Sequence, residues 1–430
     1  MYIKNLKLKN FRNYKDLNLD FNPYINIFLG SNGQGKTNIL EAIYMMTCAR
    51  SHRTAKDIDI IRKDSNAYCI DLKYVEDDKI KFKDENKDLE NLELKFINSA
   101  EGIAELNNEE YKNNIEFYKK LYSKFSSRKR LILHNDIELS KISEFCGLFN
   151  AVIFAPEDLL MIKEGPATRR RFLDLLVSQI NKHYFLELQE LQIILKNRNT
   201  ILKNIKEGNY KNNIANINNF NIDINKVHLN VWNQKLAEVS AKIIVERKNI
   251  IKEIENFAEA FHYMMSDGKE KLKIKYKTIS SIKEEDNLEI IEEKILNKLI
   301  KDEKDDISRG NTSTGPHRDD LEFLINDMSL KFYGSQGQQR SAVLSLKIAE
   351  LKMIEKKIGK KAVLLLDDVM SELDPNRRLA LIKSVNDMQV FITCTDLLQL
   401  SKDWSSIFEI EKEKRKIFEV DNAIVKLREE

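Results

Sequence analysis

The sequence lacks the patterns that mark several large classes of protein. It contains 4 cysteines, at positions 48, 69, 146 and 394, and no Cys-x-x-Cys pair, which argues against a disulfide framework and against a zinc site. It also lacks an apolar run long enough to cross a membrane, and no continuous apolar stretch precedes a small-residue cleavage site near the N-terminus. We therefore expect a cytoplasmic protein with reduced thiols and no membrane partner.

Neither sign of charge is in large excess. The chain has 71 basic and 68 acidic residues and a formal net charge of +3, so no field of the whole protein attracts nucleic acid. Any contact with nucleic acid must then come from local basic patches. With 32% charged and 42% hydrophobic residues the composition is globular, and a length of 430 residues favours roughly two or three domains.

The N-terminal segment predicts two strands followed by a strand, a loop and a helix. Apolar and polar residues alternate from Tyr2 to Leu8 and again around Leu17, which is typical of a strand pair. A short apolar run, 25–29, then ends in Gly30, and apolar residues recur at helical spacing from Ile39 onward. This order of strand, loop and helix is the context that a phosphate-binding loop needs.

The middle of the chain predicts an arm of two antiparallel helices. Apolar residues recur every three to four positions from Arg169 to Leu195, and a second helical pattern runs from about Val227 to Phe261. The asparagine-rich segment 204–226 between them has little periodicity, so we expect a loop there. Lys271 to Lys277 alternates lysine with apolar residues, which indicates a half-buried strand with a basic outer face.

Further strands are expected on both sides of the arm. The charged segment 76–145 is interpreted as an elaboration with a helix at 109–122. The expected strands are 151–154, 362–366 and 390–393, and a helix is expected from the Gly-Ser-Gln-Gly turn at 334–337 to Glu355. We therefore predict an α/β fold whose head combines both ends of the chain around an inserted helical arm. The predicted parts are 1–165 (with the elaboration), 166–300 and 301–430.

The octapeptide after the strand at 25–29 has the residues of a phosphate-binding loop. It reads Gly30, Ser31, Asn32, Gly33, Gln34, Gly35, Lys36, Thr37. Glycines let backbone N–H groups turn toward phosphates, the following helix presents its positive end, Lys36 neutralises the β- and γ-phosphates, and the Thr37 hydroxyl binds Mg²⁺. The alternative is a glycine-rich turn of no function, which the strand-to-helix context disfavours. ATP and Mg²⁺ are the expected cofactors.

Two adjacent carboxylates follow the apolar strand 362–366. Such an element is similar to a Walker B strand, in which Asp367 binds the magnesium and Asp368 polarises the attacking water. The alternative is a strand end with two solvated aspartates, which becomes less favourable beside a phosphate-binding loop. Lys36 and Asp368 are thus the candidate catalytic residues.

Ser335 opens a helix, and the sequence from Ser335 to Arg340 reads Ser-Gln-Gly-Gln-Gln-Arg. Ser335 is suited to be a simple N-cap. The functional alternative uses the same geometry, because a serine hydroxyl and the amides of a helix N-terminus form an anion site. Ser335, Gly337 and Gln338 are therefore candidates to bind the γ-phosphate of a nucleotide held by another subunit.

Together these motifs resemble the heads of ABC-type ATPases, and more closely the RecF family of bacterial recombination mediators. Finer matches to that family are spread over nearly the whole chain. They are Phe11-Arg12-Asn13-Tyr14, Arg50-Ser51-His52-Arg53, Ala155-Pro156-Glu157-Asp158-Leu159, Arg169-Arg170-Arg171-Phe172-Leu173-Asp174 and Gly315-Pro316-His317-Arg318-Asp319-Asp320.

The resemblance implies an ATP-dependent homodimer, in which each nucleotide lies between the loop of one subunit and the Ser335 motif of the other. Ser371 to Asp374 would be the D-loop at that interface, and the arm would be lobe II. It further implies a clamp on single-stranded, gapped or duplex DNA that acts in recombinational repair, replication-fork maintenance and SOS induction. The implied partners are RecO and RecR, and indirectly RecA and single-strand-binding protein.

Two positions depart from the wider ABC pattern. Asp368 replaces the usual glutamate, and Thr395 stands where many relatives have a histidine, so the sequence does not favour fast hydrolysis. Glu157 is expected near the place of the usual Q-loop glutamine. We accordingly expect a weak ATPase in which ATP binding is mainly a dimerisation switch.

Basic residues outside these motifs are the candidates for DNA contacts, since phosphates are bound mostly by Lys and Arg. The candidates are Arg50, Arg53, Arg128, Lys129, Arg130, Lys271, Lys273 and Lys275. For each patch the alternative of a solvated face is at least as favourable. Arg169 to Arg171 are equally suited to pair with acidic neighbours. His317 and Arg318 lie in a Gly-Pro turn, for which the resemblance favours a role near the nucleotide or DNA over a purely structural turn.

Two other classes of ATPase share the same head. A structural chromosome protein of the SMC type separates the head halves with a much longer coiled coil than the short arm expected here. In a transporter's nucleotide-binding subunit, the phosphate-binding loop and the signature motif are much closer in sequence than Lys36 and Ser335. Both alternatives are therefore less favourable than a DNA-repair clamp.

Overall fold

The computed structural model describes residues 1–54, 56–76, 89–99, 102, 105–106, 129–208, 214–217, 220–371, 373, 377–378, 380–381, 388–396 and 414–428. They form two compact units, which are described separately. The head unit is Met1–Asp158 with Val343–Glu430, and the arm unit is Leu159–Ala342. Both ends of the chain thus contribute to one unit, as the sequence predicted.

The first sheet of the head unit is antiparallel, with the order β2-β1-β4-β5-β6-β7. Its strands are β1 (Tyr2–Phe11), β2 (Tyr14–Asp20), β4 (Ala67–Val75), β5 (Leu89–Ile97), β6 (Lys129–His134) and β7 (Ile137–Glu138). The predicted N-terminal strand pair is confirmed, and Leu8 lies opposite Leu17 on it. These two leucines point into the core because the side chains of a strand alternate between its faces.

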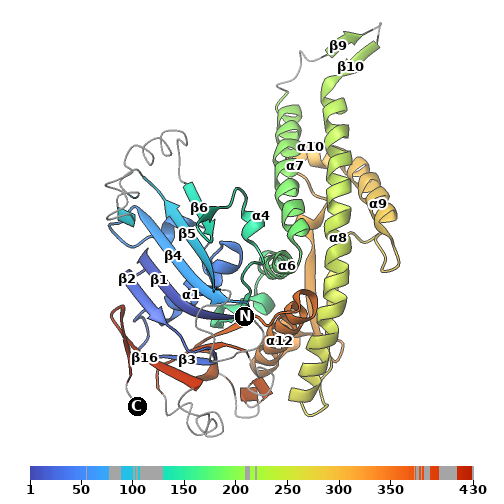
Figure 1. The fold of residues 1–430 in the computed structure, drawn as a ribbon. Coiled ribbons are helices and arrows are strands. Elements are labelled where there is room, and N and C mark those ends of the chain that lie inside the picture. The colour runs from blue at the N-terminus through green and yellow to red at the C-terminus, as the bar shows by residue number, and fades with distance from the viewer. Residues whose placement is uncertain are drawn as a thin grey trace. The chain divides into compact units, whose positions relative to one another are not determined.

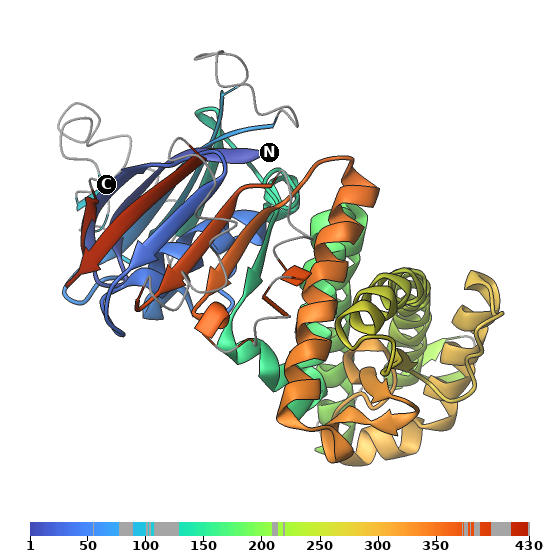
Figure 2. The same ribbon diagram turned by 90° about the horizontal axis from the view of Figure 1, so that it is seen from below.

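The second sheet of the head unit has the order β17-β16-β3-β15-β14-β8. Its strands are β3 (Ile25–Leu29), β8 (Ala151–Phe154), β14 (Val363–Asp367), β15 (Val390–Cys394), β16 (Arg415–Asp421) and β17 (Ile424–Leu427). Figure 2 shows the parallel strands side by side, from red β16 through blue β3 and orange β15 and β14 to teal β8. Because parallel strands present their carboxyl ends at one edge, Gly30 and Asp367 lie at the same edge of this sheet.

Helix α1 (Lys36–Cys48) follows the glycine-rich loop and packs into the core between the two sheets (Figure 1). Ile39, Leu40 and Ile43 are fully buried there. Short elements of the head unit are η1 (Asp57–Asp59), α4 (Ile142–Phe145) and η4 (Val369–Ser371), and η2 (Pro156–Leu159) follows β8. The core thus fixes the start of α1 against the end of β3.

The arm unit is largely helical, with α7 and α8 side by side (Figure 1). Its helices are α5 (Leu160–Lys163), α6 (Pro166–Ile180), α7 (Lys182–Lys206), α8 (Ile224–Met265), α9 (Leu288–Lys301), α10 (Glu303–Arg309) and α11 (Leu330–Tyr333). The single helix predicted through Arg169–Leu195 is wrong. Asn181 is extended (φ −130°, ψ 106°) and caps α7 by accepting a hydrogen bond from the His183 N–H, which separates α6 from α7.

The segment between the two long helices contains two short strands where a loop was expected. A hairpin of β9 (Ile214–Ile217) and β10 (Phe220–Asp223) lies within the segment expected to be a loop. The helix predicted at 109–122 lies outside the described residues.

A small antiparallel sheet completes the arm unit, with the order β11-β12-β13. It contains the predicted strand β11 (Leu272–Lys277), β12 (Asp320–Ile325) and β13 (Met328–Ser329). The short helix η3 (Pro316–Arg318) directly precedes β12. Because β12 pairs along all of β11, residues 301–342 cluster with the arm unit and not with the head part to which the sequence assigned them. Helix α12 (Gln336–Ile358) begins in the arm unit and continues into the head unit.

Candidate functional site

Two glycines of the 30–37 loop lie where no other residue fits. A Cβ at Gly30 would be 2.2 Å from the carbonyl oxygen of Val420 on β16. Gly35 has φ +117°, and a Cβ there would be 2.7 Å from both Asn13 Nδ2 and Tyr14 Oη. Side chains cannot be accommodated at such distances, and L-residues avoid this φ. The backbone of the loop is therefore held against the β1–β2 turn and β16.

Gln34 is bound from two distant parts of the head unit. Its carbonyl accepts hydrogen bonds from Asn13 Nδ2 (3.2 Å) and the Ala423 N–H (3.1 Å), and its side-chain oxygen accepts one from the Asn422 N–H (2.6 Å). Asn422 and Ala423 have positive φ and form the β16–β17 turn. No local pattern of the sequence indicates this support, although the alternation around Asp421-Asn422-Ala423 is a signal for the hairpin itself.

Lys36 is buried at the start of α1. Its ammonium donates hydrogen bonds to the carbonyls of Gly30 and of Ser31, the latter at 3.2 Å. The loop thus curls around the lysine, with Ser31, Asn32 and Gly33 exposed. The first N–H groups of a helix have no partner inside the helix, so the beginning of α1 supplies donors next to a fixed positive charge. This arrangement is suited to bind an anion.

The two residues predicted to bind Mg²⁺ are in direct contact. Thr37 Oγ1 donates a 2.9 Å hydrogen bond to Asp367 Oδ1, and Thr393 Oγ1 donates another to the same oxygen at 2.8 Å. Asp367 is 3% exposed. Burial raises the pKa of its carboxyl to about 6, although both hydrogen bonds act in the opposite direction. A positive charge next to Asp367 would favour the ionised carboxylate.

The contact between Thr37 and Asp367 fits a magnesium ion bound together with phosphates. Mg²⁺ prefers oxygen ligands and commonly takes only one or two from the protein, the rest coming from water and substrate phosphates. A hydroxyl and a carboxylate side by side next to an anion-binding loop provide this set. No group of three or more His, Cys, Asp or Glu suited to a metal occurs among the residues that the structure describes.

Asp368 lies beside this pair in a left-handed conformation (φ +51°). Its N–H donates a 2.8 Å hydrogen bond to Thr393 Oγ1, so one threonine holds both neighbouring aspartates. Thr395 is exposed just beyond the end of β15. Of the segment expected to be a D-loop, 371–374, residues 372 and 374 lie outside the part of the chain that the structure describes.

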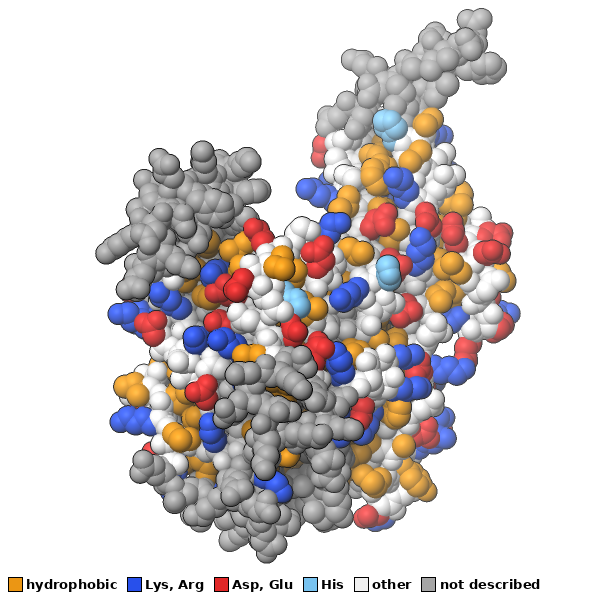
Figure 3. All heavy atoms as spheres, viewed as in Figure 1, with side chains coloured by type: hydrophobic (Ala, Val, Ile, Leu, Met, Phe, Trp, Pro, Cys, Tyr) orange, Lys and Arg blue, Asp and Glu red, His pale blue; other side chains and the backbone are white. Residues whose placement is uncertain are grey.

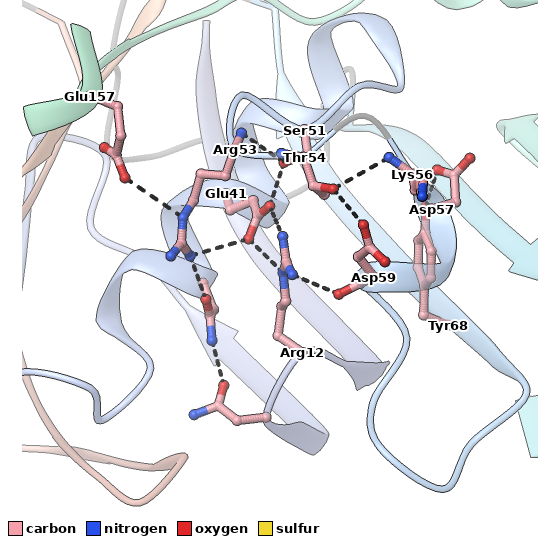
Figure 4. Close-up of polar contacts among 12 residues, drawn as sticks. Arg12, Glu41, Ser51, Arg53, Thr54, Lys56, Asp57, Asp59, Tyr68 and Glu157 are labelled. Atoms are coloured by element: carbon pink, nitrogen blue, oxygen red, sulfur yellow. Dashed lines mark hydrogen bonds and ion pairs between the residues drawn. The ribbon is translucent and has the colours of Figure 1, made fainter. Parts of the chain in front are cut away.

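A buried carboxylate on α1 organises the surroundings of the loop (Figure 4). Glu41 is fully buried and accepts two hydrogen bonds from the Arg12 guanidinium, at 2.9 and 2.6 Å, and one from the Ser51 hydroxyl. Burial alone would raise the pKa of Glu41, but the hydrogen bonds from Arg12 and Ser51 hold it below its usual value. Arg12, whose φ is +54°, also donates to the Asp59 carbonyl at 2.6 Å.

Arg53 joins this cluster to the first turn of α1, next to the 30–37 loop (Figure 4). Its Nη1 donates to Asn38 Oδ1 (3.1 Å), and Asn38 Nδ2 donates to Asn13 Oδ1 (2.8 Å). Arg53 also forms ion pairs with Glu41 (3.7 Å) and Glu157 (3.9 Å). Its predicted role as a DNA contact therefore competes with three partners inside the head unit, and Glu157 lies near this network as part of η2.

Ser335 caps α12 in the arm unit. Its hydroxyl accepts a 3.2 Å hydrogen bond from the Gln338 N–H, and Gln338 Oε1 accepts a 2.9 Å hydrogen bond from the Ser335 N–H. This reciprocal pair is a capping box. Ser335 is exposed, and the N–H groups of Gln336 and Gly337 have no carbonyl of the helix to bind. The N-cap interpretation is thus correct, and it leaves the Ser335 hydroxyl able to donate a hydrogen bond and two amides without a carbonyl of the helix.

Four of the six predicted DNA contacts whose side chains the structure describes, Arg53 among them, take part in ion pairs within their own unit. Arg130 pairs with Asp57, Lys271 with Glu259 (3.1 Å) and Lys273 with Asp327 (2.6 Å). On the face seen in Figure 3, basic and acidic side chains are interspersed. Among the described residues, Arg50 and Lys275 are exposed without an acidic partner within 4.0 Å. Arg128 and the side chain of Lys129 lie outside the described part.

The other arginines and the Gly-Pro turn have structural partners. Arg169 pairs with Asp320 in a two-point interaction (2.6 and 3.0 Å), and Arg170 donates to the Asp319 carbonyl (2.7 Å). His317 Nε2 donates to the Thr312 carbonyl (3.1 Å). The sequence prediction of acidic neighbours for this arginine run is therefore confirmed for Arg169.

Comparison with known proteins agrees with these features. A family model described as the RecF/RecN/SMC N terminal domain matches residues 2–419. A DNA replication and repair protein RecF from Ruminiclostridium cellulolyticum is 41% identical over 396 residues, 92% of this chain and 93% of that protein. The RecF of Clostridium tetani is 38% identical over 426 residues, 98% of this chain and 99% of that protein.

Solved structures give the same result. A structure of the recombination mediator protein RecF with ATP, from the RecFOR pathway, superimposes with a TM-score of 0.79 at 33% identity, covering 100% of this chain and 98% of that one. No helix in the described part of the chain is long and apolar enough to span a membrane. By its motifs, its α/β fold of the ABC ATPase type and these similarities, the chain belongs to the RecF family of DNA replication and repair proteins.

Proposed function

We propose that this chain binds ATP and Mg²⁺ at the 30–37 loop and uses them as a switch for dimerisation on DNA. The observation that carries the proposal is the 2.9 Å contact between Thr37 and Asp367, which joins the end of the phosphate-binding loop to the end of β14. The bound ATP described for a solved RecF structure supports the same ligand here. Mg²⁺ would be held by Thr37 and Asp367, and it supplies charge neutralisation at the phosphates.

The side chain of Lys36 and the backbone of the 30–37 loop would both bind the phosphates of ATP. The Lys36 ammonium, which now binds the carbonyls of Gly30 and Ser31, would turn to the β- and γ-phosphates. The backbone N–H groups from Asn32 to Thr37 would surround the phosphates, because positive φ values at Gly33 and Gly35 orient them. Asn13 and the β16–β17 turn keep Gln34 in place during this exchange.

Hydrolysis is proposed to be slow. Asp368 would orient the attacking water, but its carboxylate is one methylene shorter than that of glutamate, and its backbone is fixed by Thr393. Thr395 offers no imidazole for this step. ATP binding, and not its turnover, is therefore the proposed signal.

The proposed consequence of ATP binding is that two copies of the chain join. Ser335, Gly337 and Gln338 of one copy would bind the γ-phosphate held by the other, through the Ser335 hydroxyl and the first amides of α12. The exposure of Ser335 and its capping geometry support this role. A hydroxyl that already accepts from Gln338 can still donate its own hydrogen.

The dimer is proposed to act on single-stranded, gapped or duplex DNA in recombinational repair. RecO and RecR are the proposed partners, with RecA and single-strand-binding protein as indirect ones, because the similar solved structures belong to a recombination mediator of the RecFOR pathway. Arg50 and Lys275 are the preferred DNA contacts, since the other described candidates are neutralised by acidic neighbours.

Sedimentation with ATP, with ADP and without nucleotide, each with and without gapped duplex DNA, tests this proposal. The parent chain should dimerise only with ATP. Lys36→Met should lose nucleotide binding. Ser335→Arg should keep nucleotide binding by the monomer and lose the dimer, whereas Ser308→Arg, at an exposed serine of α10, should behave like the parent. Dimers of Ser335→Arg that persist with ATP would remove the proposed sandwich.

A further inference from the structure

The capping box at the start of α12 has a third member from another element. Gln338 Nε2 donates a 2.9 Å hydrogen bond to Glu270 Oε1. Glu270 lies between α8 and β11, and its side chain is 23% exposed. All of these residues belong to the arm unit. The Gln338 amide is therefore fixed at both ends, by the Ser335 N–H on its oxygen and by Glu270 on its nitrogen.

Glu270 is itself held by a buried histidine. His262 Nε2 lies 3.0 Å from Glu270 Oε2, and because a carboxylate only accepts, the imidazole donates. His262 is completely buried near the end of α8. The Glu270 N–H donates to Ser266 Oγ (3.1 Å), so the backbone of the turn between α8 and β11 is fixed as well. Each carboxylate oxygen thus has one partner, and the side chain has little freedom.

We propose that Glu270 is a positioning residue for the Ser335 motif, with His262 holding Glu270 in place. This inference rests on the proposed role of Ser335 in ATP-dependent dimerisation. Capping of α12 needs only Ser335 and Gln338. The additional contact fixes which end of the Gln338 amide faces Ser335, since a flipped amide would set an NH₂ group against the Ser335 N–H.

The orientation of Gln338 decides which donors remain for a phosphate. With its oxygen on the Ser335 N–H and its own N–H on the Ser335 hydroxyl, Gln338 occupies two groups of the first turn. The Ser335 hydroxyl can then donate its hydrogen to a phosphate, and the amides of Gln336 and Gly337 have no carbonyl of the helix to bind. The carboxylate of Glu270 would repel a phosphate bound near Ser335, but the two hydrogen bonds that it accepts partly offset its negative charge. The arrangement also joins the end of the 42-residue helix α8 to the motif.

Hydrogen exchange of the nucleotide-free monomer tests the geometry directly. Glu270→Ala removes the acceptor, and the Ser335 and Gln338 amides should then exchange about tenfold faster, as expected for one lost charge-assisted hydrogen bond. Glu270→Gln keeps an acceptor oxygen for Gln338, and its amide can donate to the other tautomer of His262, so exchange should stay near the parent rate. Glu259→Ala, which removes an acidic ion-pair partner from the same end of α8, is the matched control. Equal exchange in Glu270→Ala and the parent would overturn the proposal.

Measurements of dimerisation then test whether this contact of Glu270 affects the proposed role of Ser335. Glu270→Ala should bind ATP as a monomer with parent affinity and dimerise about tenfold more weakly, while Glu270→Gln should restore dimerisation. If Ser335→Arg abolishes dimers and Glu270→Ala leaves their affinity unchanged, the positioning role is wrong and the proposed function stands. If Ser335→Arg also dimerises with ATP, the proposed function fails, and the positioning role fails with it.

Discussion

Thr37 and Asp367 are 330 positions apart in the chain, yet their side chains share a 2.9 Å hydrogen bond. Because this pair is the proposed site for Mg²⁺ beside the phosphates of ATP, Asp367→Asn should remove the magnesium-dependent part of ATP affinity, by about tenfold or more. ATP binding in the presence of a chelator should change little. Titration calorimetry with and without Mg²⁺ measures both. Asp16→Asn, at an exposed position of β2, should keep the parent response. A full magnesium effect in Asp367→Asn would contradict this site.

Gly35 and Gly33 provide a matched pair for the geometry of the loop. Both have positive φ, but a Cβ at Gly35 would be 2.7 Å from Asn13 and Tyr14, whereas a Cβ at Gly33 has nothing within 4 Å. Gly33→Ala should therefore cost about 1 kcal/mol of unfolding free energy from φ alone, and Gly35→Ala about 2 to 4 kcal/mol together with ATP binding. Urea unfolding and nucleotide titration compare the two variants. Similar losses at both positions would contradict the role given to Asn13 and Tyr14.

Local pattern was sufficient to predict the strand, glycine-rich turn and helix around residues 30–37, the strand that ends at Asp367 and the N-cap at Ser335. Each of these depends on residues within one strand–turn–helix segment, where apolar spacing and glycine content limit the possible structures. The same reasoning predicted the N-terminal strand pair of the head unit and the second long helix of the arm, α8. The family resemblance added the order in which these local elements are assembled, and the fold agrees with it.

Partners that are distant in the chain could not be predicted. Gln34 is bound by Asn422, 388 positions away, and Arg130 pairs with Asp57 across 73 positions. A lysine or arginine looks the same in sequence whether it is solvated or paired, so the predicted DNA patches included residues that the fold neutralises. The break at Asn181 was missed for a related reason, because the apolar spacing continues across it while its side chain caps the next helix.

The buried carboxylate of Glu41 should be more important for stability than any exposed acidic residue of the site. Replacing it with Gln leaves the Arg12 guanidinium without a counter-charge in a site where both are largely buried, which should cost about 3 kcal/mol or more. Glu157→Gln, on a side chain that is 48% exposed, should cost less than about 1 kcal/mol. Urea unfolding at pH 7 measures this difference.

The lowered pKa of Glu41 determines how the stability difference between the parent and Glu41→Gln changes in acid. The pKa of Glu41 is lower in the folded chain than in the unfolded chain. The stabilisation by its carboxylate is therefore complete above the pKa of the unfolded chain, and it is lost as the pH falls through the pKa of the folded chain. The gap in stability between the parent and Glu41→Gln should therefore narrow as the pH falls below about 4.5. A gap that is constant down to pH 3 would mean that the Glu41 charge is not the cause.

His317 should make the arm unit sensitive to mild acid. Its Nε2 donates to the Thr312 carbonyl, and its Nδ1 is buried without a hydrogen-bond partner among the described residues. Burial lowers the pKa of this imidazole to about 4 from 6.5, so the unfolded chain binds a proton between these values and the folded chain does not. Stability should fall as the pH drops from about 6.5 to 4, by about 2 kcal/mol at pH 5.

His317→Asn should remove this part of the pH dependence, measured by urea unfolding at pH 7 and pH 5, whereas His183→Asn, at an exposed histidine of α7, should retain it. If parent and His317→Asn lose the same free energy between the two pH values, the buried imidazole is not the group that titrates.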